Sequence, residues 1–118
     1  MEIWVNPACS KCRAATAALD EAGVAYTVRR YLEEPPTRAE LEAVLERLGL
    51  EPWDITRSKE AKEVGVAGLP KDAGHRGDWL DALVAHPRLI QRPIITADDG
   101  TTVVGRDPES LARVLPGS

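Results

Sequence analysis

Residues 1–31, MEIWVNPACSKCRAATAALDEAGVAYTVRRY, decide the fold of this 118-residue chain. The apolar run 1–5 predicts a strand that ends at Asn6-Pro7. The Ala-rich stretch 10–22 has apolar side chains at helical spacing. Residues 24–31 alternate apolar and polar side chains and predict a second strand. Strand, helix and strand within about thirty residues form a βαβ unit, whose two strands run parallel.

A helix with well-marked ends follows this unit. Thr37 and Glu40 are spaced as in a capping box, in which each side chain accepts a hydrogen bond from the other residue's backbone. Residues 41–48 carry apolar side chains at i, i+3, i+4 and i+7, and Gly49 is a natural end. The sequence therefore predicts a helix between Thr37 and Gly49.

The next segment is also helical in pattern. Residues 53–66 predict one or two short helices, and residues 71–77 form a polar stretch that predicts a loop. We expect Asp78 to cap a further helix that stops before Pro87.

The last third changes to strand patterns. Residues 94–96 predict a strand, 98–100 a hairpin turn and 101–104 the returning strand, and Asp107-Pro108 opens a final helix. The order β-α-β, helical segment, β-β-α is that of a thioredoxin-like α/β fold with a helical insertion and a mixed four-stranded sheet. We expect residues 1–118 to form a single domain.

Composition limits the class of protein. With 43% hydrophobic and 29% charged residues, the chain resembles a globular domain in water. The net charge of -4 argues against a nucleic-acid partner. No apolar run is long enough to span a membrane, and the N-terminus has no signal-peptide pattern. We therefore expect a cytoplasmic protein, in a compartment where thiols stay reduced.

The two cysteines, Cys9 and Cys12, are spaced C-x-x-C at the junction of the first strand and helix. Cys9 precedes the helix, where free backbone N–H groups and the helix dipole favour a thiolate over a thiol. Lys11 and Arg13 add positive charge nearby. We expect Cys9 to be a reactive nucleophile, and Cys12 to be able to resolve a species formed on it.

Other interpretations of the cysteines stay open. Cys12 can equally be a small buried residue on an Ala-rich helix face. A metal site is not expected, because no second ligand pair exists and His75 and His86 lack metal-binding spacing.

Three arginines stand at loops that a thioredoxin-like fold would bring near Cys9: Arg57, Arg92 and Arg106. In that fold the loop before the third strand faces the reactive cysteine and carries a cis proline, for which Pro93 is the candidate. A guanidinium group binds tetrahedral oxyanions through paired donors. The alternative is that each arginine is simply a solvated surface residue.

The motifs, in their order, resemble the glutaredoxin-coupled arsenate reductase (ArsC) family and its Spx-type relatives. The resemblance runs over essentially the whole chain. Its residues are Asn6-Pro7-Ala8-Cys9 with Arg13, Ile55-Thr56-Arg57, His86-Pro87-Arg88-Leu89-Ile90-Gln91-Arg92-Pro93-Ile94 and Gly105-Arg106-Asp107-Pro108-Glu109.

The resemblance implies that Cys9 attacks arsenate. No bound cofactor is implied; glutathione or another low-molecular-weight thiol acts as co-substrate, and glutaredoxin or thioredoxin is the reducing partner. The family's three anion-binding arginines match Arg57, Arg92 and Arg106, and Arg13 belongs to the same cysteine motif.

Two positions depart from the reductases. Val5 stands where they carry a histidine, and Cys12 stands where they carry a serine. A C-x-x-C pair resembles instead the Spx-type regulators, which sense oxidants and bind RNA polymerase. The alternatives to an arsenate reductase are thus such a regulator, or a general thiol-disulfide reductase.

Overall fold

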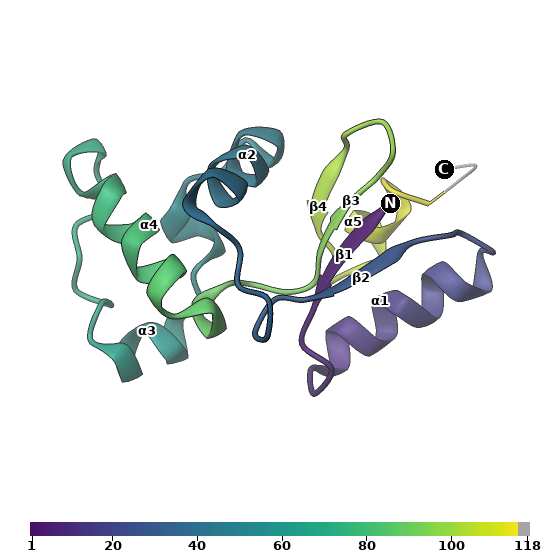
Figure 1. Ribbon diagram of the computed structural model, residues 1–118, viewed down its shortest axis with the longest axis horizontal. Helices are drawn as coiled ribbons and strands as arrows, with labels where there is room; N and C mark the ends of the chain where they lie inside the picture. Colours follow the sequence, from purple (N-terminus) through teal and green to yellow (C-terminus); the bar gives the residue numbers. More distant parts are fainter. Residues whose placement is uncertain (116–118) are drawn as a thin grey trace. The chain divides into compact units, whose positions relative to one another are not determined.

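A computed structural model describes residues 1–115. The chain forms two compact units (Figure 1). Among the described residues, 1–34 and 92–115 make the sheet unit, and Pro35–Gln91 make the helical unit.

The sheet unit contains a four-stranded mixed sheet, as the sequence predicts. Its order is β2-β1-β3-β4, with β1 parallel to β2, β1 antiparallel to β3, and β3 antiparallel to β4. The strands are β1 (Glu2–Val5), β2 (Thr27–Arg30), β3 (Ile94–Thr96) and β4 (Thr102–Val104).

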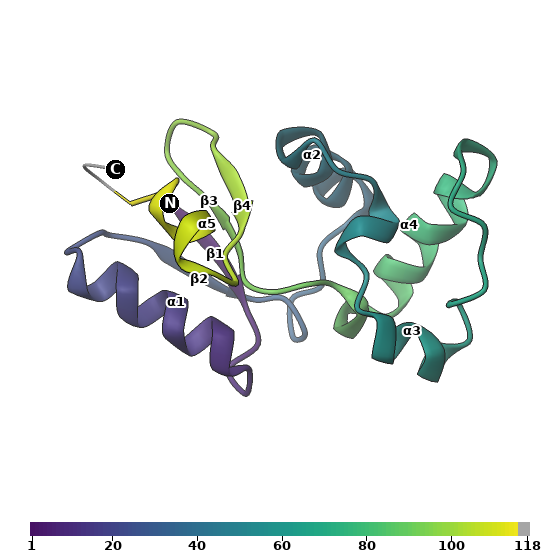
Figure 2. The same ribbon diagram turned by 180° about the vertical axis from the view of Figure 1, so that it is seen from behind.

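Two helices accompany this sheet, α1 (Ser10–Glu21) and α5 (Pro108–Ala112). Figures 1 and 2 show α1 running alongside β1 and β2. One cluster of buried side chains joins α1, the sheet and the residues after α5: Ile3, Val5, Cys12, Ala15, Leu19, Ile95, Val103 and Val114. The first turn of α1, which carries Cys12, is therefore packed in the core.

Strand β2 is shorter than the predicted strand 24–31. Its pairing with β1 begins at Thr27, which is level with Glu2, and Val28 is 46% exposed rather than buried. Val24 and Tyr26 precede the strand and still pack against the core cluster. The alternation of Val24, Tyr26 and Val28 therefore does not correspond to one buried face of a strand.

The helical unit has three α-helices and three short 3₁₀ turns within its described residues. Its α-helices are α2 (Arg38–Leu48), α3 (Ser58–Val64) and α4 (Arg76–Ala85), and its 3₁₀ turns are η1 (Pro52–Ile55), η2 (Ala73–His75) and η3 (Pro87–Leu89). The predicted capping box is present: the Glu40 backbone donates to Thr37 Oγ1 at 3.1 Å, and the Thr37 backbone donates to Glu40 Oε1 at 3.0 Å. Gly49 ends α2 with a φ of 69°.

The prediction that Asp78 caps α4 is wrong. The helix begins at Arg76, so Asp78 already lies in its first turn. Asp72 does the capping instead, because its carboxylate accepts the backbone N–H of His75 at 3.0 Å and starts η2, which leads directly into α4. The predicted loop 71–77 is therefore partly helical.

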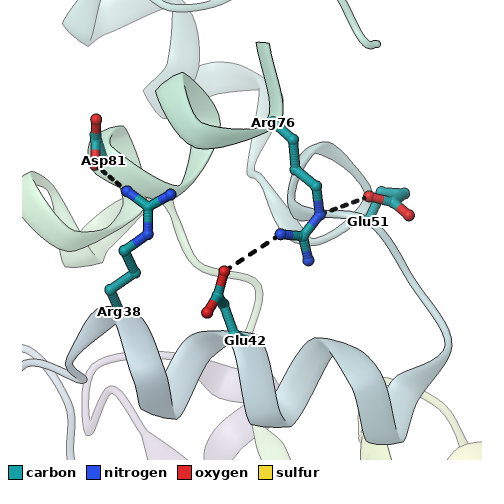
Figure 3. A network of polar contacts seen from close by, with 5 residues as sticks. All are labelled: Arg38, Glu42, Glu51, Arg76 and Asp81. Carbon is teal, nitrogen blue, oxygen red and sulfur yellow. Dashed lines mark hydrogen bonds and ion pairs between the residues drawn. The ribbon is translucent and has the colours of Figure 1, made fainter. Parts of the chain in front are cut away.

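Ion pairs connect α2, α4 and η1 inside the helical unit (Figure 3). Arg38 contacts Asp81 at 2.7 Å, while Arg76 contacts Glu42 at 3.4 Å and Glu51 at 3.2 Å. All of these side chains are well exposed, so each pair contributes little to stability.

Across residues 1–115, no helix combines the length and the apolar character that crossing a membrane requires.

Candidate active site

Cys9 is the N-cap residue of α1, with an extended backbone conformation (φ −87°, ψ 124°). Its thiol is partly exposed. Partial burial alone would raise the pKa of Cys9, but the backbone N–H groups of Cys12 and Lys11, the Arg92 guanidinium and the Cys12 thiol outweigh it. Together they lower the pKa of Cys9 to about 7, so a large fraction is thiolate at neutral pH.

Cys12 lies one helical turn further on and has a different environment. Its side chain is 1% exposed and belongs to the core cluster, and its sulfur accepts a hydrogen bond from the Asn6 backbone at 3.4 Å. Burial is the main cause that raises the pKa of Cys12 to about 11. Cys12 therefore stays protonated in the reduced protein and can donate its S–H to the Cys9 thiolate.

The strand registers bring four polar residues to one edge of the sheet. Val5 is level with Arg30, so Asn6 after β1 is level with Tyr31 after β2. Trp4 is level with Ile94, and Ile94 with Val104, so the segments before β3 and after β4 reach the same edge. The residues in this row, called the edge row below, are Tyr31, Asn6, Arg92 and Arg106.

Direct hydrogen bonds hold the edge row together with the thiol loop. Arg106 donates from Nη1 to the Arg92 carbonyl at 2.8 Å, and the Gly105 N–H donates to the Pro93 carbonyl at 2.8 Å. The Cys9 N–H donates to the Asn6 carbonyl at 2.9 Å. The peptide bond between Arg92 and Pro93 is cis. The structure thus brings Cys9, Cys12, Arg92 and Arg106 into one region of the sheet unit.

Arg57, the third predicted arginine, belongs to the helical unit. It is the N-cap residue of α3, and its Nε lies 3.1 Å from Glu60 Oε2. Its backbone N–H donates to the Leu89 carbonyl at 2.7 Å. Arg57 is therefore held on both its backbone and its side chain within its own unit.

Arg13 lines a pocket of the sheet unit. That pocket, of about 210 Å³, is lined by Val5, Pro7, Cys12, Arg13, Thr16, Val28 and Arg30. Val5 is 6% exposed and packs in the core cluster. It offers no group that could transfer a proton to or from Cys9.

Tyr31 is the neighbour of the thiol site that the sequence patterns did not identify. Its side chain is 0% exposed, and Arg92, Cys12 and Cys9 all influence the pKa of its hydroxyl. In the structure Tyr31 directly follows β2, which is parallel to the strand that precedes Asn6-Pro7. As part of a predicted strand, it carried no sign of being a site residue.

Residues 1–115 contain no cluster of three or more His, Cys, Asp or Glu side chains able to hold a metal ion. His75 pairs with Asp72 at 2.7 Å, and this carboxylate raises the pKa of the imidazole. At this edge of the sheet, the Cys9 thiolate beside the Arg92 guanidinium can act as a nucleophile.

Comparisons of the sequence and of the structure with known proteins agree on one family. The model of the ArsC family matches residues 4–114, which includes both units. An uncharacterized protein in the glnII region of Streptomyces viridochromogenes is 62% identical over 98% of both chains. An arsenate reductase of Neisseria meningitidis is 39% identical over 98% of this chain and 97% of its own. A solved structure of an arsenate reductase from Vibrio cholerae superposes with a TM-score of 0.85, at 34% identity and 98% coverage of both chains.

Proposed function

Since the chain belongs to the ArsC family, we propose that it is a thiol-dependent arsenate reductase in which the Cys9 thiolate attacks arsenic. The observation that carries this proposal is the position of Cys9 at the N-terminus of α1, with a pKa lowered to about 7 beside Arg92. Such a thiolate is nucleophilic at neutral pH.

The edge row supports an oxyanion as the substrate. An anionic nucleophile and an arsenate anion repel each other, and fixed guanidinium groups offset that repulsion. The Arg92 guanidinium helps to lower the pKa of Cys9, and the Arg106 guanidinium donates a hydrogen bond to the Arg92 carbonyl. We propose that Arg92 and Arg106 hold the anion, and we keep Arg57 and Arg13 as proposed substrate-binding residues.

The proposed reaction balances over two thiols. Cys9 sulfur forms a bond to As(V), and an arsenate oxygen leaves as water after taking up protons. A second thiol then bonds to the Cys9 sulfur, and the electron pair of the S–As bond remains on arsenic. Two thiols are oxidised to a disulfide, and arsenate is reduced to arsenite.

The second thiol is proposed to be glutathione or a similar small thiol, with glutaredoxin or thioredoxin restoring Cys9. Cys12 is the internal alternative. Its burial and its pKa of about 11 make it a poor nucleophile in the reduced protein. These properties favour an external thiol as the first resolving group.

A coupled assay tests the proposal. NADPH oxidation is followed with glutathione, glutaredoxin and glutathione reductase, and in parallel with thioredoxin and thioredoxin reductase. We expect arsenate-dependent turnover in at least one system, and none for Cys9→Ser. Absence of arsenate-dependent turnover in both systems would contradict the assignment.

The C-x-x-C pair favours a second candidate, a redox couple that senses oxidants or reduces disulfides. The unequal pKa values of Cys9 and Cys12, about 7 and about 11, suit such a couple. Neither activity requires an oxyanion pocket, so Arg106→Ala should leave disulfide reduction intact. A regulator would in addition retain RNA polymerase subunits in one redox state and lack arsenate-dependent turnover.

A further inference from the structure

The hydroxyl of Tyr31 is a buried polar group with an unused hydrogen-bonding capacity. The side chain is 0% exposed, and the hydroxyl proton has no acceptor among residues 1–115, since the Arg92 guanidinium beside it can only donate. A buried donor without an acceptor destabilises the folded state, and such groups are rare in native proteins. A hydroxyl in this position therefore requires an acceptor that residues 1–115 do not supply.

The register of the sheet shows where that acceptor would lie. Tyr31 is a member of the edge row, level with Asn6, whose carbonyl accepts the N–H of Cys9 and whose N–H donates to Cys12 sulfur. Arg92, in the same row, lies close enough to influence the hydroxyl electrostatically, as do both cysteines. The hydroxyl thus belongs to the region where the proposed substrate binds.

The phenol remains a donor under all working conditions. Burial raises the pKa of Tyr31 to about 12, although the Arg92 guanidinium opposes that shift. Unlike an arginine, a neutral phenol adds no charge to the pocket. It can donate one directed hydrogen bond to an anionic oxygen, and bonds to charged acceptors are the stronger ones.

We propose that Tyr31 is an oxyanion-binding residue, whose hydroxyl donates a hydrogen bond to an oxygen of the tetrahedral anion held by Arg92 and Arg106. The inference rests on the proposed function, because it requires that the site accept an oxyanion. A disulfide substrate has no oxygen at its reacting atoms, so Tyr31 would favour oxyanions over disulfides.

The test uses Tyr31→Phe and the matched control Tyr26→Phe. Tyr26 is the chain's other tyrosine, and its hydroxyl already donates to Asp20 at 2.7 Å, away from the edge row. Sulfate and phosphate serve as unreactive tetrahedral probes. Their dissociation constants are measured from protection of Cys9 against iodoacetamide, and thermal unfolding is followed with and without each probe.

We expect Tyr31→Phe to weaken sulfate binding about tenfold or more, the size of effect that loss of a hydrogen bond to an anion produces. Without the probe, its unfolding temperature should equal or exceed that of the wild type, because an unsatisfied buried hydroxyl is removed.

The pH midpoint of Cys9 alkylation should not move in Tyr31→Phe. For arsenate, KM should rise more than kcat falls. Tyr26→Phe should bind sulfate like the wild type.

Equal sulfate and phosphate binding by wild type and Tyr31→Phe would overturn the role of Tyr31 and leave the proposed function standing. A lower unfolding temperature without the probe, together with a shifted alkylation midpoint, would show a structural role and also overturn it. If the wild type binds neither probe and does not turn over arsenate, the proposed function and the role of Tyr31 fail together.

Discussion

The acidity of Cys9 comes from groups that the backbone fixes in place. Two of them are N–H groups in the first turn of α1, which have no acceptor within the helix. The Arg92 guanidinium and the Cys12 thiol complete the set. These groups lower the pKa of Cys9 without a contribution from Val5, whose side chain has no titratable group.

Arg92 and Arg106 should have separable effects. Arg92→Ala should raise the pKa of Cys9 and lower kcat/KM for arsenate by about a hundredfold, because it removes both a thiolate partner and an anion contact. Arg106→Ala should lower kcat/KM by about tenfold through weaker anion binding. The measurements are steady-state kinetics and pH-dependent alkylation of Cys9.

In this comparison Arg113→Ala is the control, since Arg113 follows α5 and is outside the edge row. The outcome that would contradict the site is full arsenate activity in Arg92→Ala. A shift of the Cys9 pKa in Arg106→Ala as large as that in Arg92→Ala would instead contradict their separate roles.

Cys12 should affect the stability of the protein through its packing, and the pKa of Cys9 through its thiol proton. Cys12→Ser buries a hydroxyl in the core cluster and should destabilise the protein by about 1–3 kcal/mol. Cys12→Ala avoids the polar group and should be the less destabilising change. Only Cys12→Ala should raise the pKa of Cys9, because a serine hydroxyl can still donate to the thiolate, and turnover with glutathione should persist in both. The readouts are denaturant unfolding, alkylation and the coupled assay; loss of all turnover in both variants would make Cys12 a required resolving thiol.

At the scale of single elements, α2 shows how local sequence determines a helix end. Both hydrogen bonds of its capping box are formed, and Gly49 ends it in the left-handed conformation. Thr37→Ala should therefore cost about 1 kcal/mol of unfolding free energy. Thr16→Ala is the control, because Thr16 lies inside α1 and caps nothing. Equal unfolding midpoints for Thr37→Ala and wild type would contradict the role of the cap.

The start of α4 shows the limit of such reasoning. Asp72 and Asp78 are both acceptable caps by residue type, and the sequence alone does not decide between them. The 3₁₀ turn η2 decides the outcome, because it joins the Asp72 cap to α4 without a break. The same holds for β2, whose first paired residue depends on β1 rather than on the alternation of its own side chains.

At the scale of the whole molecule, the sequence predicted the element order, the mixed sheet and the family. Those features depend on local patterns and on motifs that are contiguous in the chain. The edge row depends on strand register, which only the assembled sheet defines, so Tyr31 could not be recognised beside Arg92 and Cys9. The opposite environments of Cys9 and Cys12 also follow from packing, because both cysteines belong to one short motif.

The whole chain carries a net charge of -4, so a bound anion depends on local positive charge rather than on the overall field. The proposed attack on arsenic therefore requires that Cys9 is a thiolate at neutral pH. The most direct test is the rate of Cys9 alkylation by iodoacetamide against pH, with the modified residue identified by mass spectrometry.

We expect that rate to rise with pH along a single titration with a midpoint near 7. One pH unit below the midpoint, about a tenth of Cys9 should react as thiolate, and one unit above it about nine-tenths. A midpoint near that of free cysteine, about 8.5, would contradict the account, because Cys9 would then be largely an unreactive thiol at neutral pH.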